Sequence, residues 1–331
     1  MKKLPVLLLI SFCFVTNSIS QKCQNPKLFS ATVNGKHGFI DSNGRIALPI
    51  IYEEVGEFSE GLIPFQKDKK WGYINQKGKV IIRPQFDWAS SFSEGLARVH
   101  LNYQTGFIDK SGKLVIQTKF DQENTHDFVE GMALFKQGGK LGFIDRKGNI
   151  TVTPKYDRAE DFSNGLSLIG INEKFGYINK KGNEVIRPDF DEAGSFQEGL
   201  APVEKNGQHF FINTAGETVV RPEVDYSDIF FGGLFVEGSV RWKLNNNLWG
   251  VIDRKGKFVI QPRFESLWDF SNGLARFEEN GKYGFIDKNG TIAIRAQFEF
   301  AVDFCGGLNW VEKDGERGYV NKSGEFVWKD H

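Results

Sequence analysis

The sequence predicts an all-β protein built as an array of about nine β-hairpin units of roughly 34 residues each. The segment Gly-aromatic-Ile-Asp/Asn recurs along the chain, and a glycine follows three residues beyond its last position. The copies begin at Gly38, Gly72, Gly106, Gly142, Gly176, Phe210 (where the glycine is lost), Gly250, Gly284 and Gly318. The spacing is constant except for longer steps from Gly106 to Gly142 and from Phe210 to Gly250. Such regular self-similarity is typical of repeat architectures.

Each unit carries two further marks. An aromatic residue followed by an acid appears in Pro84 to Asp87, Pro154 to Asp157, Pro188 to Asp191 and Pro262 to Glu265. A Phe-x-x-Gly-Leu/Met segment follows, beginning at Phe58, Phe92, Phe128, Phe162, Phe196, Phe270 and Phe304. The repeated glycines and phenylalanines are therefore predicted to be structural.

The segment Lys69 to Val99 resembles the WG-repeat family, bacterial β-repeats named for a Trp-Gly pair, and the resemblance extends over about residues 28 to 331. Only Trp71-Gly72 and Trp249-Gly250 keep the literal pair. Other residues replace the tryptophan at His37, Thr105, Leu141, Phe175, His209, Tyr283 and Arg317. The resemblance implies a β-repeat domain that mediates binding, with no general activity attached.

Within one unit, the residues from Trp71 to Asn75 alternate with the period of two that marks a strand. Asn75 to Gly78 is predicted to be a turn, because an Asn or Asp side chain accepts backbone N–H bonds and glycine adopts positive φ. Val80 to Ile82 is expected to form the return strand, and Pro84 to end it. All nine units carry this turn.

Phe86, Ala89 and Phe92 are spaced by three, which favours a helical turn or an irregular bend there. With a strand at Leu96 to His100, each unit has about three strands, and neighbouring units must stack to bury their apolar faces. A closed β-propeller typically uses four strands and about 40 residues per blade. The sequence therefore favours an open β-solenoid or superhelix, with the closed propeller as the alternative.

Residues 1–20 read as a cleavable signal peptide: Lys2 and Lys3 precede an apolar run from Leu4 to Val15. That run is shorter than the roughly 20 residues that a membrane span needs. The mature chain, residues 21–331, is then one β-repeat domain with no transmembrane segment, exported to the periplasm or the cell exterior. Cys23 and Cys305 remain, and the sequence leaves open whether they form a disulfide.

The chemistry of the sequence indicates no enzyme. The chain has 42 basic and 42 acidic side chains, and this balance argues against nucleic acid as a partner. It lacks the catalytic motifs of zinc proteases, α/β-hydrolases, dinucleotide-binding enzymes and P-loop NTPases. We expect no cofactor and no metal, because the five histidines lack ligand spacing and the Asp/Asn-x-x-Gly turns offer too few oxygens for calcium.

Charged residues form registers along the repeats. The acids after the aromatics are expected to be structural rather than a glycosidase pair. Basic residues occupy the Asp/Asn-x-x-Gly turns, and Glu60, Glu94, Glu130 and Glu198 precede the Phe-x-x-Gly glycine. We expect two separate lines of opposite charge, either as a solvated, edge-protecting surface or as part of an anion-binding groove.

An atypical longer unit spans about residues 210–249, and its irregular stretch from Asp225 to Leu248 contains Arg241, Trp242 and Lys243. Insertions in repeat proteins map to loops that often bind, so these three residues are the candidate contact site, with Arg241 and Trp242 as the anchor pair. The preferred function is an exported, non-catalytic scaffold that binds a protein or envelope partner. The alternative is a carbohydrate-contacting or structural envelope protein whose exposed Trp88, Trp268 and Trp310 stack on sugar rings.

Overall fold

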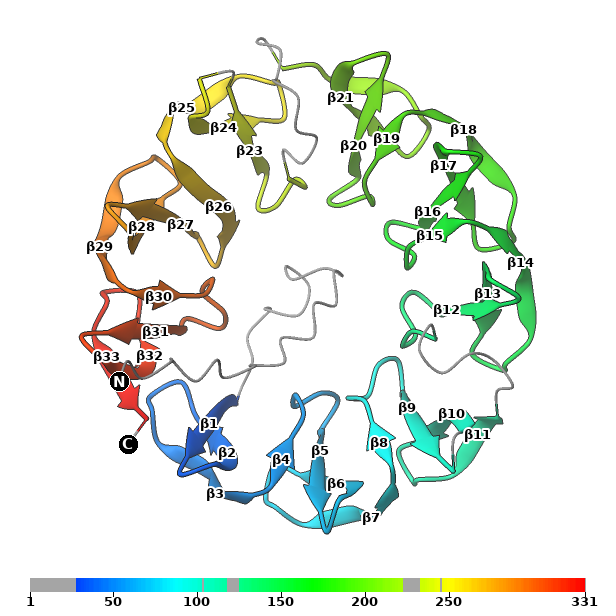
Figure 1. Ribbon diagram of the computed structural model, residues 1–331, viewed down its shortest axis with the longest axis vertical. Helices are drawn as coiled ribbons and strands as arrows, with labels where there is room; N and C mark the ends of the chain where they lie inside the picture. Colours follow the sequence, from blue (N-terminus) through cyan, green and yellow to red (C-terminus); the bar gives the residue numbers. More distant parts are fainter. Residues whose placement is uncertain (1–27, 103, 118–124, 223–232, 245, 331) are drawn as a thin grey trace, which may run out of the picture.

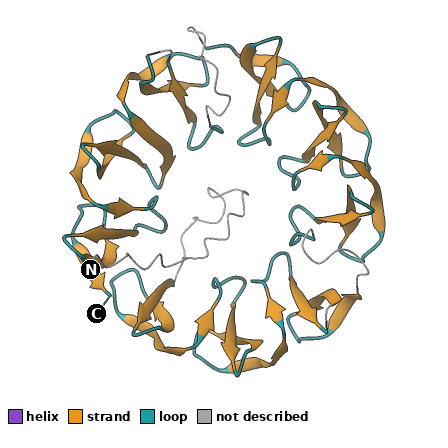
Figure 2. Ribbon diagram, viewed as in Figure 1, coloured by secondary structure: helices purple, strands orange, loops and turns teal. Residues whose placement is uncertain are grey.

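The computed structural model describes residues 28–102, 104–117, 125–222, 233–244 and 246–330. These residues form nine antiparallel sheets, which follow one another around a ring (Figure 1). Each sheet is one blade, and the blades are numbered 1 to 9 in chain order. Strands and turns make up the regular structure (Figure 2), and no described helix could cross a membrane. The predicted signal peptide lies outside the described residues.

Blades 1 to 3 contain β1 (Phe29–Val33), β2 (Lys36–Ile40) and β3 (Ile46–Tyr52); β4 (Glu54–Val55), β5 (Leu62–Lys67), β6 (Lys70–Asn75) and β7 (Val80–Phe86); and β8 (Trp88–Ala89), β9 (Leu96–Leu101), β10 (Gln104–Asp109) and β11 (Leu114–Gln117). Blades 4 to 6 contain β12 (Met132–Gln137), β13 (Lys140–Asp145) and β14 (Ile150–Tyr156); β15 (Arg158–Ala159), β16 (Leu166–Ile171), β17 (Lys174–Asn179) and β18 (Glu184–Phe190); and β19 (Glu192–Ala193), β20 (Leu200–Lys205), β21 (Gln208–Asn213) and β22 (Thr218–Val220). Blades 7 to 9 contain β23 (Ser239–Lys243), β24 (Trp249–Asp253) and β25 (Phe258–Phe264); β26 (Ser266–Ser271), β27 (Leu274–Glu279), β28 (Lys282–Asp287) and β29 (Ile292–Phe298); and β30 (Phe300–Ala301), β31 (Asn309–Lys313), β32 (Glu316–Val320) and β33 (Phe326–Lys329).

The prediction of an open solenoid is wrong: the array closes into a nine-bladed β-propeller. The error arose because the sequence indicated three strands per unit, whereas most blades contain four. The segment expected to hold a helical turn contains a short first strand, such as β8, which pairs with β9. Beyond β8 the chain keeps contact with β9, because Ser90 N donates to Arg98 O and Ser93 N to Leu96 O. A four-stranded blade therefore fits into a single repeat.

Side chains of the first and last blades close the ring. The Tyr319 hydroxyl donates to the Ser30 carbonyl oxygen over 2.9 Å, and the rings of Phe29 and Tyr319 lie 5.6 Å apart, edge to face. Leu308 of blade 9 is buried with Phe29 and Ala31 of blade 1. In the described residues this junction is made by packing, since each sheet is built from consecutive strands.

An aromatic pair joins successive blades. We call the first residue of each Gly-aromatic-Ile segment the WG-type glycine. The phenylalanine that begins Phe-x-x-Gly packs against the aromatic residue that follows this glycine in the preceding blade, as Phe92 does with Tyr73. Such pairs lie 4.7 to 4.9 Å apart at Tyr73–Phe92, Phe107–Phe128, Phe143–Phe162, Tyr177–Phe196, Phe211–Phe235 and Phe285–Phe304. Phe270 is buried against the aliphatic Val251 instead. The repeated phenylalanines therefore form the core between blades.

The WG-type glycine makes room for the fourth strand. A Cβ atom at Gly72 would lie 2.6 Å from Ile82 O and from Pro84 N, where β7 bulges over β6. The same close approach of backbone occurs at Gly142, Gly176, Gly250 and Gly284. Phe210 is tolerated in blade 6, where β22 pairs with β21 at two positions only.

The return strand does not end at Pro84, as the sequence led us to expect. β7 continues to Phe86, which pairs with Trp71 beyond the bulge. Proline is accommodated at this bulge because the ladder is interrupted there and its nitrogen needs no acceptor.

The Asp/Asn-x-x-Gly segments are turns, as predicted. In each of the nine copies one side-chain oxygen of the first residue accepts the backbone N–H groups two and four residues later. Asn75, for example, accepts from Lys77 N at 2.9 Å and Lys79 N at 3.0 Å. The backbone therefore supplies the partners of these oxygens.

Replacing Asn75 with alanine should lower the free energy of unfolding by about 1 kcal/mol, because two backbone N–H groups lose their acceptor. Urea denaturation followed by tryptophan fluorescence measures the change. Asn75→Asp keeps the acceptor and is the control. Equal midpoints for the two variants would show that the side-chain bonds do not stabilise the turn.

The Leu308→Ala variant tests ring closure. It leaves a cavity between blades 9 and 1 and should lower the free energy of unfolding by about 2–5 kcal/mol, the usual range for a buried Leu→Ala change. Limited proteolysis should then cleave the chain in both blade 1 and blade 9. A variant that is cleaved only in blade 9 would indicate an open array.

Candidate functional site

Acidic and amide side chains in the turn between the first and second strands connect successive blades from blade 2 to blade 9. Glu94 and Gly95 form a two-residue hairpin turn with positive φ at both residues, 53° and 82°. The Glu94 carboxylate accepts the N–H of Gly131 in blade 4 over 2.7 Å. Equivalent bonds join Glu60 to Gly95, Glu130 to Gly165, Asn164 to Gly199, Glu198 to Gly238, Glu237 to Gly273 and Asn272 to Gly307.

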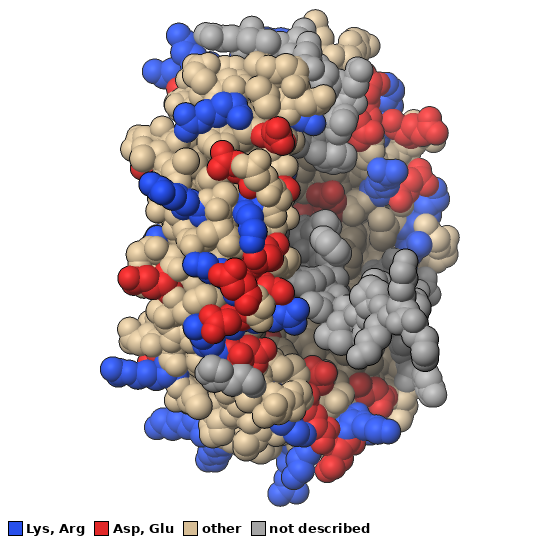
Figure 3. All heavy atoms as spheres, turned by 60° about the vertical axis from the view of Figure 1, so that its left-hand side comes forward, with Lys and Arg blue, Asp and Glu red and all other residues tan. Residues whose placement is uncertain are grey.

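The predicted separation of the two charge lines is wrong, because four of the turn cations pair with these same carboxylates. The first-to-second strand turns project toward the middle of the ring (Figure 1). Ion pairs of 2.8 to 3.2 Å join Lys110 to Glu60, Lys180 to Glu130, Arg254 to Glu198 and Lys288 to Glu237. Red and blue side chains are interleaved along the visible surface (Figure 3). These four pairs therefore link neighbouring blades.

The acids that follow an aromatic residue, such as Asp87 after Phe86, connect blades at the end of the sheet opposite to the first-to-second strand turns. At this end the chain passes from one blade to the next. We call this the linker end. Asp87 accepts from Lys70 Nζ of blade 2 and from Asn102 N of blade 3. Asp191 and Glu299 make the same two kinds of contact in their blades. The Lys70 ammonium and the Asn102 N–H hold the pKa of Asp87 below its ordinary value. These hydrogen bonds give the acids a structural role.

Arg241, Trp242 and Lys243 do not lie in the insertion. They belong to β23, which pairs regularly with β24. Trp242 is 4% exposed in the core of blade 7. The Arg241 guanidinium lies over the Trp249 ring, and its Nε is 3.2 Å from the Asp269 carboxylate of blade 8. Lys243 also lies over Trp249. The expected anchor pair is thus engaged within the propeller.

Most of the insertion precedes β23. The separation between Phe210 and Phe235 exceeds that between the equivalent residues of blade 5 and blade 6, Gly176 and Phe196. Residues 223–232, which include most of this difference, lie outside the described residues. The rest of the extra length widens the turn between β23 and β24, where Leu244 N donates to Leu248 O.

The first residues of the short first strands form a variable row at the linker end. The row comprises Glu54, Trp88, Arg158, Glu192, Ser266 and Phe300. The residue after each is small or aliphatic and packs inward, as Ala89 and Ala301 do. The sequence analysis did not select this row. The row could have been found in the sequence, because its residue type changes from copy to copy while the residue after it stays apolar.

Trp88 and Phe300 are the exposed aromatic residues of this row. They are 36% and 39% exposed, more than any other Trp or Phe in the described part of the chain. Trp88 contacts the His100 ring at 5.0 Å, and the Arg98 guanidinium lies 4.9 Å from its centroid. Burial and the Arg98 charge lower the pKa of His100, so this neighbour is neutral at pH 7.

The other two tryptophans proposed for sugar stacking are less exposed. Trp268 contacts Tyr283 edge to face, and the Arg276 guanidinium lies 4.2 Å from its centroid. Trp310 packs against Tyr319 and Trp328. These rings therefore make their main contacts within their own blades.

The row borders a pocket at the linker end of blade 5, of about 400 Å³. We call it the blade-5 pocket. It is lined by Asp157, Arg158, Gly170, Asn172, Glu173, Phe175, Asp191 and Glu192. Four carboxylates and one guanidinium thus surround an aromatic ring and a glycine. Lys140 and Lys174 hydrogen-bond Asp157 and Asp191 and hold the pKa of each below its ordinary value, so both are ionised at neutral pH.

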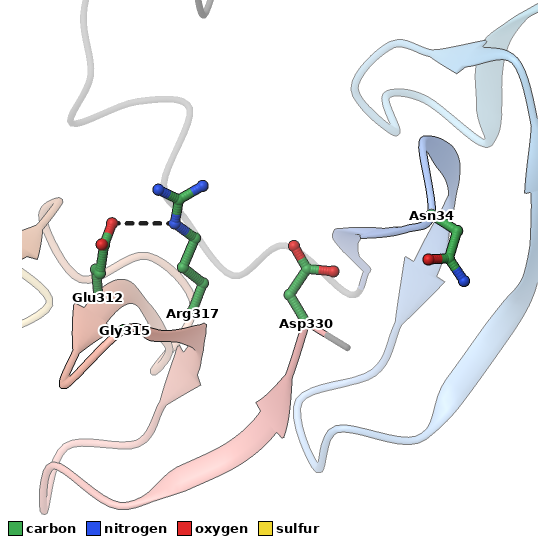
Figure 4. Close-up of a pocket in the computed structure, with 5 residues that line it drawn as sticks. All are labelled: Asn34, Glu312, Gly315, Arg317 and Asp330. Atoms are coloured by element: carbon green, nitrogen blue, oxygen red, sulfur yellow. Dashed lines mark hydrogen bonds and ion pairs between the residues drawn. The ribbon is translucent and has the colours of Figure 1, made fainter. Parts of the chain in front are cut away.

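A second pocket, of about 330 Å³, lies where blade 9 meets blade 1. Arg317 and Glu312 line one side and form an ion pair of 3.0 Å, while Asp330 and Asn34 line the other (Figure 4). Its walls are polar, and its one guanidinium is already paired. It offers a ligand less free charge than the blade-5 pocket.

The histidines lie apart in the ring. His37 Nε2 is 3.7 Å from Glu54, His209 Nε2 is 3.4 Å from Glu204, and His126 Nδ1 is 3.0 Å from Asp161. Within the part of the chain that the structure describes, no three His, Cys, Asp or Glu side chains gather as metal ligands. Cys305 is half-buried, and Cys23 lies outside the described residues.

Comparison with protein families matches a model described as "WG containing repeat" to residues 38–71, 71–103, 106–140, 142–175, 175–208, 249–283 and 283–316. The chain belongs to the WG-repeat family. The unmatched stretch between residues 208 and 249 includes the longer unit. No curated protein matches the chain.

Solved structures resemble this WG-repeat protein in fold. A eukaryotic initiation factor matches with a TM-score of 0.59 at 10% identity, covering 92% of this chain and 97% of its own. This match supports the closed propeller against the open array. The designed protein Ika8 (TM-score 0.45, 13% identity, 81% and 96% covered) and BamB from Moraxella catarrhalis (0.45, 10%, 81% and 90%) are more distant.

The linker-end acids predict how stability depends on pH. The folded-state pKa values of Asp87, Asp157, Asp191 and Glu299 are lowered by their lysine partners. Their stabilisation is therefore present above the unfolded pKa of about 4 and is lost as the pH falls through the lower folded values.

The urea midpoint of the WG-repeat protein should accordingly fall as the pH drops below about 4, and 1 M NaCl should weaken this dependence, since salt screens exposed charges. Replacing Asp87, Asp157 and Asp191 together with asparagine should flatten the curve over the same range. An unchanged slope would show that these acids are not linked to folding.

Proposed function

We propose that this WG-repeat protein is an exported, non-catalytic scaffold that binds a protein partner through the variable row at its linker end. The observation that carries the proposal is the exposure of Trp88 and Phe300 in that row. Large aromatic side chains and arginine dominate the energetics of protein interfaces, and Arg158 belongs to the same row.

The surroundings of the row support this assignment. The turn acids and many of the turn cations are paired between blades, while the linker carboxylates bind lysines and backbone N–H groups. The row combines aromatic, basic, acidic and hydroxyl side chains, and its residue type changes from each member to the next. A closed ring that carries such a row can engage a partner at several points at a small cost in ordering.

The export part of the proposal rests on residues 1–20, with their basic start and apolar run. The partner is then a protein of the periplasm, the envelope or the exterior. The near-neutral composition is compatible with such a partner and gives no general attraction to nucleic acid.

A carbohydrate ligand is the second candidate, favoured by the exposure of Trp88. Stacking on a sugar needs a free aromatic face, and the Trp88 ring already contacts His100 and Arg98. Because the row spreads charged and apolar side chains over several blades, it fits a protein surface better than a sugar ring.

A pull-down with the mature chain, residues 21–331, from an envelope extract tests the function. The double variant Trp88→Ala/Phe300→Ala should reduce capture of a specific protein by at least tenfold, because each lost aromatic anchor costs about 1–2 kcal/mol. Ile150→Ala/Val185→Ala removes comparably exposed apolar side chains from the outer strands and is the matched control.

Equal loss with both variants would contradict a role for the row. Capture of glycan by the native chain, with no protein retained, would favour the carbohydrate alternative. Purified partner and native chain should then reproduce the difference by isothermal titration calorimetry.

A further inference from the structure

The blade-5 pocket occupies a place where the repeat departs from its own pattern. Gly170 lies in the second strand opposite Phe175, the residue at the WG tryptophan position. The corresponding second-strand residues of the other blades all carry side chains: Thr32, Gln66, His100, Lys136, Glu204, Lys243, Glu278 and Glu312. In blade 5 the Phe175 ring and the Cβ atom of Arg158 pack against Gly170 instead, at 3.2 Å and 3.1 Å from where a Cβ of residue 170 would lie, so the ring forms a wall of the pocket.

A second departure lies in the adjacent turn. Glu173 has a φ of 60°, the left-handed region in which glycine costs least. Five other blades place Gly35, Gly139, Gly207, Gly281 and Gly315 at this turn position, and blade 2 places Lys69 there. Blade 5 instead carries a carboxylate, and that carboxylate lines the pocket.

The pocket also collects charges that the propeller itself does not use. Among the described residues, neither Glu173 of blade 5 nor Glu192 of blade 6 has an ion-pair partner. The Arg158 guanidinium lies 5.7 Å from the centroid of the Phe175 ring and pairs with no acid of the described chain. The Lys140 and Lys174 ammonium groups offset Asp157 and Asp191, so Glu173 and Glu192 together outweigh Arg158 and leave the pocket with a small excess of negative charge.

We infer that the blade-5 pocket takes the side chain of a lysine or arginine from the partner protein. The cationic group would bind between Glu173 and Glu192, and its methylene stem would lie in the pocket against the wall that Phe175 forms. Such a stem packs on apolar surface while its charged head stays among polar groups. This inference rests on the proposed function and names the chemistry of the contact.

The size and composition of the pocket favour this ligand over a sugar. About 400 Å³ is within the usual range for a small-ligand site and is ample for one long side chain. A neutral sugar gains no charge interaction from Glu173 and Glu192, whereas a cation gains one from both. Phe175 is only 8% exposed, so it offers a wall for a stem but little face for stacking.

The test uses cadaverine, a diamine that reproduces the lysine stem and ammonium group. Nuclear magnetic resonance of the full mature chain, labelled with ¹⁵N, should show shifts of the amides of Asn172 to Phe175 on titration. The apparent Kd should rise severalfold in 0.5 M NaCl, because the contacts are ionic. The double variant Glu173→Gln/Glu192→Gln should weaken binding about tenfold.

Glu278→Gln is the matched control, since Glu278 occupies the row of Gly170 in blade 8 and makes no ion pair in the described structure. It should bind cadaverine as the native chain does. Gly170→Gln, which introduces the residue found at Gln66, should displace the Phe175 ring that packs against Gly170, disrupt the pocket wall and abolish the shifts. The amide spectrum of each variant reports whether it is folded.

The inference is overturned if cadaverine leaves these amides unmoved, or if the Glu173→Gln/Glu192→Gln chain binds it as well as the control does. N-acetylglucosamine moving the same amides, with cadaverine inert, would assign the pocket to a sugar. The proposed function is judged separately: a partner lost with Trp88→Ala/Phe300→Ala would uphold the scaffold even where the pocket fails.

Discussion

The packing of a phenylalanine ring of one blade against the core of the preceding blade, in most cases against a second aromatic ring, is the interaction on which the rest of this structure depends. A single blade cannot bury both faces of its own sheet, so its stability comes from its neighbours. The pair of Phe92 and Tyr73 shows the arrangement: one ring stands at the start of a blade and the other in the middle of the preceding one. Repetition of this contact at a constant distance sets a constant rotation between blades.

Hydrogen bonds then hold each blade at both ends. At the turn end, a carboxylate such as Glu94 accepts the N–H of the next blade, and at the linker end Asp87 joins a lysine of one blade to the backbone of the next. Buried or half-buried backbone N–H groups need such partners. Most of the repeated charged residues therefore stabilise contacts between blades. The charged residues without such contacts, such as Glu173 and Glu192, are candidates for binding.

Function in a repeat protein is best sought where the copies differ from one another. The aromatic, glycine and Asx positions are kept in most blades because packing and turns require them. The residues of the variable row differ from blade to blade. In blade 5, Gly170 and Glu173 both differ from the residues at the same positions of most other blades. Gly170 accommodates the Phe175 ring that forms a wall of the pocket, and Glu173 adds a carboxylate without an ion-pair partner to its lining.

Much of the local structure could be predicted from the residues. The turn at Asn75, the return strand that begins at Val80 and the burial of Phe92 follow from short-range chemistry, and the structure confirms each. The first strand was missed because β8 is two residues long and sits in a segment spaced by three. Arg241 and Trp242 were misplaced because the extra residues could not be located without the strand register.

The sequence by itself determined the repeat, its family, its turns and its apolar core, since these depend on residues close together in the chain. Only the tertiary structure decided that nine units close into a ring, because closure depends on the angle between blades and on contacts such as Tyr319 with Ser30, 289 residues apart. It also decided that turn lysines meet turn glutamates of an earlier blade, as Lys110 meets Glu60, and that Arg158 and Glu192 of neighbouring blades share one pocket.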